Sequence, residues 1–114
     1  RLTMSVISLT KIQNVLPEFI DTRLMPSAPD WMKFMLGASK PFALRRADEL
    51  ITENLPMLKA SGMVNDQNQL DIEQFKEFLN GGFNSSPKVT LFGFNFDKQD
   101  GDALMGIIDK YKDY

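Results

Sequence analysis

The sequence contains neither cysteine nor histidine. Without cysteine there is no disulfide bond, no thiolate nucleophile and no sulfur-ligated metal. Without histidine the chain lacks the commonest general base and the commonest zinc ligand, so Ser-His-Asp and Cys-His catalytic groups are excluded. We therefore expect no metal site, no cofactor and no catalytic activity. A small carboxylate-dependent enzyme is the catalytic alternative, because paired carboxylates need no histidine.

Long hydrophobic runs are also lacking. No window approaches the roughly 20 apolar residues that a membrane-spanning helix needs. The short apolar run near the N-terminus is interrupted by Ser5, Ser8 and Thr10, and no small-residue cleavage site follows, which argues against a signal peptide. These observations predict a cytoplasmic protein without membrane association.

The chain does have enough apolar material for one core. It has 114 residues, of which 43% are hydrophobic and 11% aromatic, including nine Phe and seven Met. A chain of this length buries roughly two thirds of its unfolded surface and is too short for two ordinary domains. We expect a single domain over residues 1–114, with a sub-division into an N-terminal helical segment (1–38) and a second unit (39–114).

The net charge of −2 is unevenly distributed along the chain. Residues 1–46 contain seven basic and three acidic groups, a net charge of +4. Residues 47–114 contain six basic and twelve acidic groups, a net charge of −6. The simplest interpretation is two solvated faces that complement each other within one molecule. The alternatives are head-to-tail self-association and binding of a polyanion to the basic half.

Apolar residues at helical spacing dominate the first part of the sequence. Residues 10–24 have the stripe of an amphipathic helix, which Pro17 interrupts with a kink or a new start. The proline-containing segment 25–29 stops this helix. A short apolar helix is expected over residues 30–36, with Gly37 as its C-cap.

A longer helix is predicted next. Ser39 is its expected N-cap and Pro41 its first helical position. Pro56 removes one backbone hydrogen bond, so the helix is expected to break nearby, and Gly62 ends it.

The second half of the chain mixes short strands with helices. Residues 63–71 place two apolar pieces around a polar turn, which predicts a small hairpin. Asp71 and Gln74 form a capping-box pair for a compact helix that Gly81-Gly82 ends. Residues 88–96, β-branched and aromatic, predict a strand that pairs with the hairpin.

Asp97 and Asp100 are expected to cap a last helix. Gly93 predicts a bulge or bend in the preceding strand, and Gly106 predicts close packing of the last helix. The pattern as a whole predicts an α+β fold, with four or five helices and a small two- or three-stranded antiparallel sheet.

Two acidic turns have side chains typical of cation sites. The side chains at alternating positions from Asn65 to Asp71 suggest a calcium loop, but Leu70 occupies the glycine position and Lys76 the position of the bidentate Glu. Asp97, Asp100 and Asp102 form the second acidic group, and helix capping and the helix dipole explain acids at a helix start. We therefore expect a hairpin turn and two helix caps, with no metal bound.

Residues 31–36, Trp-Met-Lys-Phe-Met-Leu, are the most unusual stretch. A helix that is apolar on most of its circumference is normally buried, so the first interpretation places this stretch in the core. The alternative is an interface, because exposed aromatic and Met side chains are typical anchors for a protein partner. The interface candidates are Trp31, Met32, Phe34 and Met35.

Basic residues near the predicted start of the longer helix provide a second candidate surface. Lys40, Arg45 and Arg46 could meet phosphate groups there, since backbone N–H groups at a helix start also point outward. The density of basic residues is ordinary for a protein surface, so any nucleic-acid binding is expected to be weak.

The stretch from Leu55 to Tyr111 resembles small uncharacterised proteins carried by prophages and gut-bacterial mobile elements. The resemblance rests on LPMLKASGMVNDQNQLDIEQFKEFL and on KVTLFGFNFDKQDGDALMGIIDKY: a polar turn, a strand, and an Asp-capped helix that ends in aromatic residues. It implies a phage-type assembly or accessory protein, with no activity or cofactor attached.

Taken together, these features predict a non-catalytic protein that binds a protein partner or self-associates. A nucleic-acid-binding accessory protein that uses the basic N-terminal half is the alternative. A small carboxylate-dependent enzyme ranks third, and no specific small-molecule ligand is implied.

Overall fold

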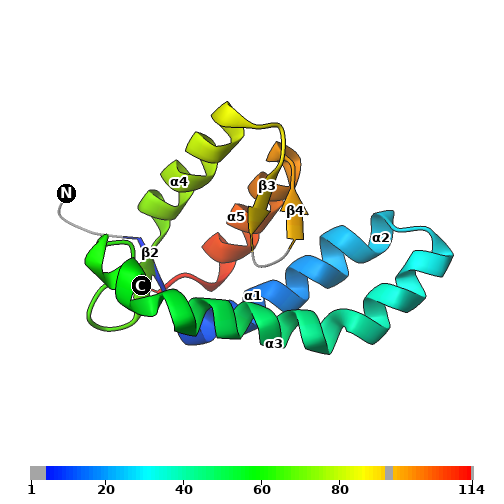
Figure 1. The fold of residues 1–114 in the computed structure, drawn as a ribbon, viewed down its shortest axis with the longest axis horizontal. Coiled ribbons are helices and arrows are strands. Elements are labelled where there is room, and N and C mark those ends of the chain that lie inside the picture. The colour runs from blue at the N-terminus through cyan, green and yellow to red at the C-terminus, as the bar shows by residue number, and fades with distance from the viewer. Residues whose placement is uncertain (1–4, 92–93, 114) are drawn as a thin grey trace.

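The computed structural model describes residues 5–91 and 94–113 (Figure 1). Over these residues it confirms a mostly helical α+β domain with small antiparallel sheets. The elements in chain order are β1 (Val6–Ser8), α1 (Leu9–Phe19), the π-helical stretch η1 (Ile20–Leu24), α2 (Met25–Ser27), α3 (Asp30–Ala60), β2 (Gln69–Asp71), α4 (Ile72–Ser85), β3 (Val89–Leu91), β4 (Phe94–Phe96) and α5 (Lys98–Tyr111).

Helix α1 forms the centre of the molecule. Its apolar stripe is buried as predicted, and it packs against α5 on one side and against α3 on the other. At its end Phe19 stacks on Phe96 of β4, with ring centroids 4.9 Å apart. Most of the remaining core comes from the apolar faces of α4 and α5 and from the first sheet. The buried apolar residues of the whole core include Ile7, Val15, Val64, Ile72, Phe75, Leu79, Leu104 and Ile108.

Helix α1 also shows how the chain accommodates Pro17. The α-helix continues through this residue, and the following turn widens into the π-helical stretch η1. Pro17 lies on the half-buried side of the helix, away from the buried stripe. The helical conformation therefore extends through residue 24, as its apolar spacing predicts, and continues through α2 to Ser27, so it ends within the proline-containing segment 25–29 and not before it.

Helix α3 is continuous from Asp30 to Ala60, so two expected interruptions are wrong. Gly37 is not a C-cap: among the described glycines only Gly62 has a positive φ, 81°, and it follows the true end of the helix. Pro41 and Pro56 both lie inside α3. Both prolines are exposed, so water can satisfy the carbonyl groups that lose their helical partners.

The continuity of α3 also changes the role of Ser39. Its hydroxyl donates to the carbonyl of Leu36, inside the helix, instead of capping a new helix start. The expected sub-division after residue 38 falls in the middle of this helix.

The strand pairing differs from the prediction. The turn between Val64 and Leu70 does form a small hairpin, closed by a single β-bridge. However, β2 pairs with β1, with Ile7 opposite Leu70, and not with the strand after Lys88. That later strand folds back on itself as β3 and β4. The expected bend at Gly93 lies outside the described residues.

The glycines of the second half pack differently from the expectation. Helix α4 runs through Gly81-Gly82 to Ser85. A Cβ on Gly106 would meet nothing within 4 Å, so this glycine is not a close-packing position. The close approaches occur at Gly82, where a Cβ would lie 2.9 Å from Val89 Cγ2, and at Gly101, where it would lie 2.8 Å from Phe83 Cε2.

Both aspartate caps are confirmed. The Asp71 side chain accepts a hydrogen bond from the backbone N–H of Gln74 at 3.2 Å. Asp97 and Asp100 form a reciprocal capping box at the start of α5, with backbone-to-carboxylate distances of 2.8 and 3.1 Å. The polar turn before β2 is held by the Asn65 side chain, which accepts from the N–H groups of Gln67 and Gln69.

Replacing Asp97 by alanine should lower the free energy of unfolding by about 1 kcal/mol, because the N–H of Asp100 loses its acceptor. Thermal or urea unfolding would measure this loss, and Asp97→Asn, which keeps an acceptor oxygen, should lose less. An unchanged stability together with loss of calcium binding would contradict the capping interpretation.

The two oppositely charged halves meet within the molecule. Arg23 binds Asp100 at 2.8 Å, and Lys11 pairs with Asp113 near the C-terminus. Hydrogen bonds from Lys11, Ser8 and Gln69 lower the pKa of the Asp113 carboxyl to about 2. The backbone N–H of Asp113 also donates to Val6 of β1, so the end of the chain is fastened to the first strand.

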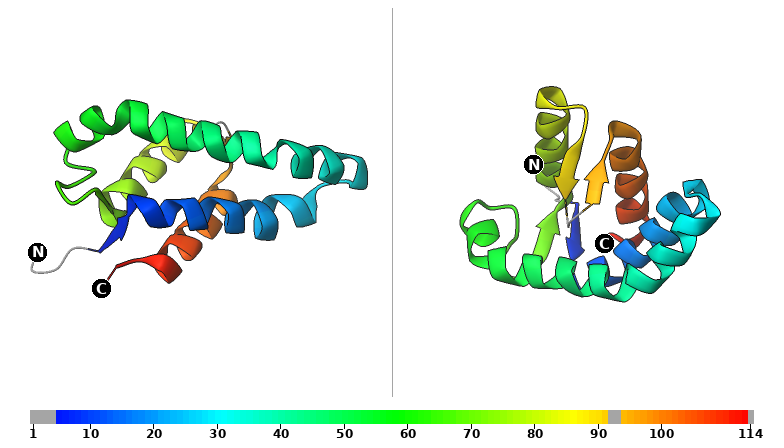
Figure 2. Two further views of the ribbon diagram at one scale, coloured as in Figure 1. Left: turned by 90° about the horizontal axis from the view of Figure 1, so that it is seen from below. Right: turned by 45° about the vertical axis from the view of Figure 1, so that its right-hand side comes forward.

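The molecule is elongated, with extents of 47 × 28 × 25 Å. Helices α1 and α3 run antiparallel and project beyond the body, with α2 at their far tip (Figure 2). Strand β1 and the segment that follows α5 lie side by side at the opposite end, where the N–H of Asp113 donates to Val6 (Figures 1 and 2). Of the helices in the described ranges, none combines the length and hydrophobicity required to cross a membrane.

Candidate interaction surface

The apolar stretch at the start of α3 lies on the surface. Trp31 is 65% exposed, Phe34 81% and Met35 59%, and Met32 is also exposed. The interpretation that placed this stretch in the core is therefore wrong. The short helix 30–36 was expected to pack as a separate element, but it is the first part of a long helix that projects past the core.

The buried and exposed residues of α3 lie on opposite faces. Ala47 is the buried residue of this helix, and it faces α1. At 3.6 residues per turn, Trp31, Met35, Ala38 and Phe42 lie roughly 180–240° around the helix from Ala47. All four are exposed. We call these four residues the α3 stripe.

Phe42 belongs to this surface, although it is not among the interface candidates predicted from the sequence. It is 64% exposed, and the guanidinium group of Arg45 lies over its ring, 5.3 Å from the centroid. Its position seven residues after Met35 was the available signal. Because a helix end was expected at Gly37, Met35 and Phe42 were assigned to different helices. Their spacing was therefore not recognised as one helix face.

The exposed aromatic area is large for so small a protein. An aromatic side chain has about 150–250 Å² of surface to bury, so the exposed fractions of Trp31, Phe34 and Phe42 leave roughly 300–500 Å² uncovered. Methionines 32 and 35 add to this area. The largest apolar patch on a typical monomer is of this order and is often functional.

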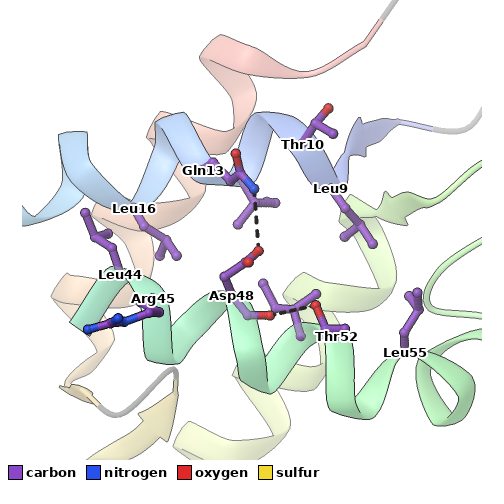
Figure 3. A pocket seen from close by; sticks show the side chains of 11 residues that line it. Leu9, Thr10, Gln13, Leu16, Leu44, Arg45, Asp48, Thr52 and Leu55 are labelled. Atoms are coloured by element: carbon purple, nitrogen blue, oxygen red, sulfur yellow. Dashed lines mark hydrogen bonds between the residues drawn. The ribbon is translucent and has the colours of Figure 1, made fainter. Parts of the chain in front are cut away.

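A groove of about 480 Å³ separates α1 from the middle of α3 (Figure 3). Asp48 is its only carboxylate; its side chain accepts from Gln13 Nε2 at 3.5 Å, and its carbonyl from the Thr52 hydroxyl at 3.0 Å. The remaining lining is mainly leucine and isoleucine. Thr10 and Thr52 supply the hydroxyl groups of the lining, and Thr52 donates to the backbone carbonyl of Asp48 and not to its carboxylate, so no carboxylate pair lines the groove.

A second, more apolar groove of about 530 Å³ lies between the C-terminal half of α3 and α4. Met57 of α3 and Phe78 of α4 are exposed beside it. Thus α3 is loosely packed along much of its length, and the α3 stripe is on the far side of the helix from the core.

The basic candidates for nucleic-acid binding do not form one surface. Lys40, Arg45 and Arg46 project in three different directions from α3 by helical geometry. Lys40 binds Asp21 at 2.7 Å, whereas Arg46 lies 3.3 Å from Glu49 and 3.6 Å from Glu53. The structure therefore does not bring these three residues together as a phosphate-binding group.

Several acidic residues are engaged as structural partners. Glu18 accepts hydrogen bonds from Lys110 and Tyr111, which lower its pKa, and the same contact with Glu18 raises the pKa of both partners. Within residues 5–91 and 94–113, no three acidic side chains gather in a way that could hold a metal ion. These contacts keep Glu18 ionised and orient it in an ion pair between α1 and α5.

Comparisons with protein families, with curated proteins and with solved structures give no match to this chain. The candidate surface therefore rests on the sequence and on the geometry of α3.

Proposed function

We propose that this protein is a non-catalytic interaction or assembly protein that binds its partner through the α3 stripe. The observation that carries the proposal is the exposed row of Trp31, Met35 and Phe42 on the helix face opposite Ala47. A soluble helix normally directs such residues inward and polar residues outward. Here the outward face of its first turns is apolar, and covering it would remove that surface from water.

The chemistry of the stripe matches that of an interface centre. Tryptophan and other aromatic residues contribute most of the binding energy at protein interfaces, and methionine adapts to an irregular partner surface. Charged residues follow the stripe along α3, where Arg46 pairs with Glu49 after Phe42. An apolar centre with a charged margin is typical of interfaces between proteins.

The resemblance of residues 55–111 to prophage and mobile-element proteins supports the same proposal, since it implies an assembly or accessory role. Nucleic-acid binding ranks lower because the basic side chains of α3 diverge and have acidic or aromatic neighbours. A carboxylate-dependent enzyme ranks third because Asp48 stands alone in its groove.

Replacing Trp31 by alanine should change the stability of the isolated monomer by no more than about 0.5 kcal/mol, because the side chain is largely exposed. The same variant should lose association, because it removes the largest ring of the stripe. A melting curve and light scattering on one sample would measure both effects.

Val15→Ala is the control for the melting curve, because Val15 is buried in α1 and its truncation should destabilise the fold. A loss of about 3–5 kcal/mol for Trp31→Ala would show that Trp31 is a core residue. That result would remove the basis of the proposed function.

A further inference from the structure

We infer that the α3 stripe pairs with the α3 stripe of a second copy, the two helices running antiparallel across a two-fold axis. This inference rests on the proposed function and names the partner. Trp31, Met35, Ala38 and Phe42 are separated by four, three and four residues. That is the alternation of apolar positions along one seam of a coiled coil.

The stripe is complementary to itself when one copy is reversed. An axis between residues 36 and 37 places Trp31 opposite Phe42 of the second copy, and Met35 opposite Ala38 of the second copy. A large side chain then faces the smallest one in the two central layers, and two rings face each other in the two outer layers. Large and small side chains at facing positions interdigitate, which is the requirement for close helix packing.

A parallel pair would lack this fit. It would place Met35 against Met35 and Ala38 against Ala38 of the second copy, so one layer would be crowded and the next would contain a void. An antiparallel pair also sets the two helix dipoles in opposite directions. Both considerations favour the reversed arrangement.

The exposed area is sufficient for a weak, specific dimer. Trp31 and Phe42 of the stripe, together with Phe34 beside it, expose roughly 300–500 Å² in each copy, so two copies contribute roughly 600–1,000 Å² before the methionines are counted. A specific interface needs about 1,000 Å² in total, and interfaces near this limit are transient. The expected product is a dimer that dissociates on dilution.

Charge favours the isologous pair over a head-to-tail chain of copies. A head-to-tail contact would draw on the opposite charges of the two halves, but Lys11, Arg23 and Lys40 already bind acids of the same molecule. The α3 stripe itself contains no charged residue. Two identical stripes can therefore meet without charge repulsion, and their two-fold contact closes after two copies.

Trp31 is the only tryptophan of the chain, so it reports directly on this contact. Its fluorescence emission should shift to shorter wavelength as the protein is concentrated from about 1 to about 500 µM, because the ring leaves water. Sedimentation over the same range should show mass rising from one copy towards two. A constant single-copy mass with constant emission would overturn the inference, as would a mass growing beyond two copies.

The antiparallel register has its own test in two complementary variants. Trp31→Glu and Phe42→Lys should each be monomeric alone. When mixed, Glu at position 31 of one copy faces Lys at position 42 of the other, and the remaining Phe42 faces the remaining Trp31. The mixture should therefore regain a dimer containing one copy of each variant. A parallel pair would place each new charge against an aromatic ring and regain nothing.

Ala60→Glu is the matched control, because it adds a charge at an exposed alanine of the same helix outside the stripe. It should keep the concentration dependence of the unmodified chain. A strictly monomeric parent with a stable Trp31→Ala variant overturns self-pairing alone, whereas a destabilised Trp31→Ala variant overturns the stripe as an interface.

Discussion

Phe19→Ala should lower the free energy of unfolding by about 3–5 kcal/mol. The side chain is fully buried, and it stacks on Phe96 with a centroid distance of 4.9 Å. Truncation removes the apolar contacts of the ring and leaves a cavity between α1 and β4 that the neighbouring backbone can only partly fill. A domain of this size has a total stability of about 5–15 kcal/mol, so the variant should be close to unfolding at physiological temperature. Urea unfolding followed by circular dichroism would measure the loss.

Phe42→Ala is the matched control, because it is the same substitution at a largely exposed ring. Its effect on stability, measured below the concentration at which copies associate, should stay within about 0.5 kcal/mol. A double-mutant cycle with Phe96→Ala should give a coupling of about 0.5–1.5 kcal/mol for the stacked pair. If Phe19→Ala and Phe42→Ala proved equally mild, the assignment of core and surface would be wrong.

Gly101→Val should destabilise the protein by about 1–3 kcal/mol, the usual effect of overpacking. A Cβ at this position would lie 2.8 Å from Cε2 and 3.2 Å from Cζ of Phe83. Valine adds two more methyl groups and has a single preferred rotamer in a helix, so it cannot turn away from the ring. Either the Phe83 ring must move away from Gly101 or α4 and α5 must separate. Thermal unfolding would detect the loss.

Gly106→Ala in the same helix should act in the opposite direction. No atom outside the neighbouring turns of its own helix lies within 4 Å of its would-be Cβ, so alanine should stabilise the protein by up to about 1 kcal/mol through its higher helix propensity. Equal effects of the two substitutions would contradict the described packing of α4 on α5.

Local signals in the sequence predicted the caps and the core of this fold. Asp71 and Asp97 cap their helices as expected, because a capping side chain contacts backbone only three residues ahead. The buried stripe of α1 was equally visible, since its apolar residues recur at helical spacing. Such features depend on neighbours in sequence, so a single chain is enough to find them.

Non-local features were not predictable in the same way. Strand β1 has three residues, too few to show a period, and it forms by pairing with residues more than sixty positions away. Gly37 and Pro41 are typical of a helix boundary, yet α3 continues past both. At Pro41 the carbonyl group that loses its helical partner can bond to water instead, because this part of the helix is exposed. The interface candidates were selected by their chemistry, and their position on the surface became clear only with the direction of α3.

The fastening of Asp113 to β1 has a consequence for how the molecule can be used and attached. Val6 and Asp113 are hydrogen-bonded, so the chain enters and leaves the domain at one pole, while the start of α3 lies at the other (Figure 2). A fluorophore, an affinity tag or a fused domain on either terminus would therefore stand well away from Trp31. In an antiparallel pair of copies, such attachments would lie at the two opposite ends of an elongated dimer, far from each other.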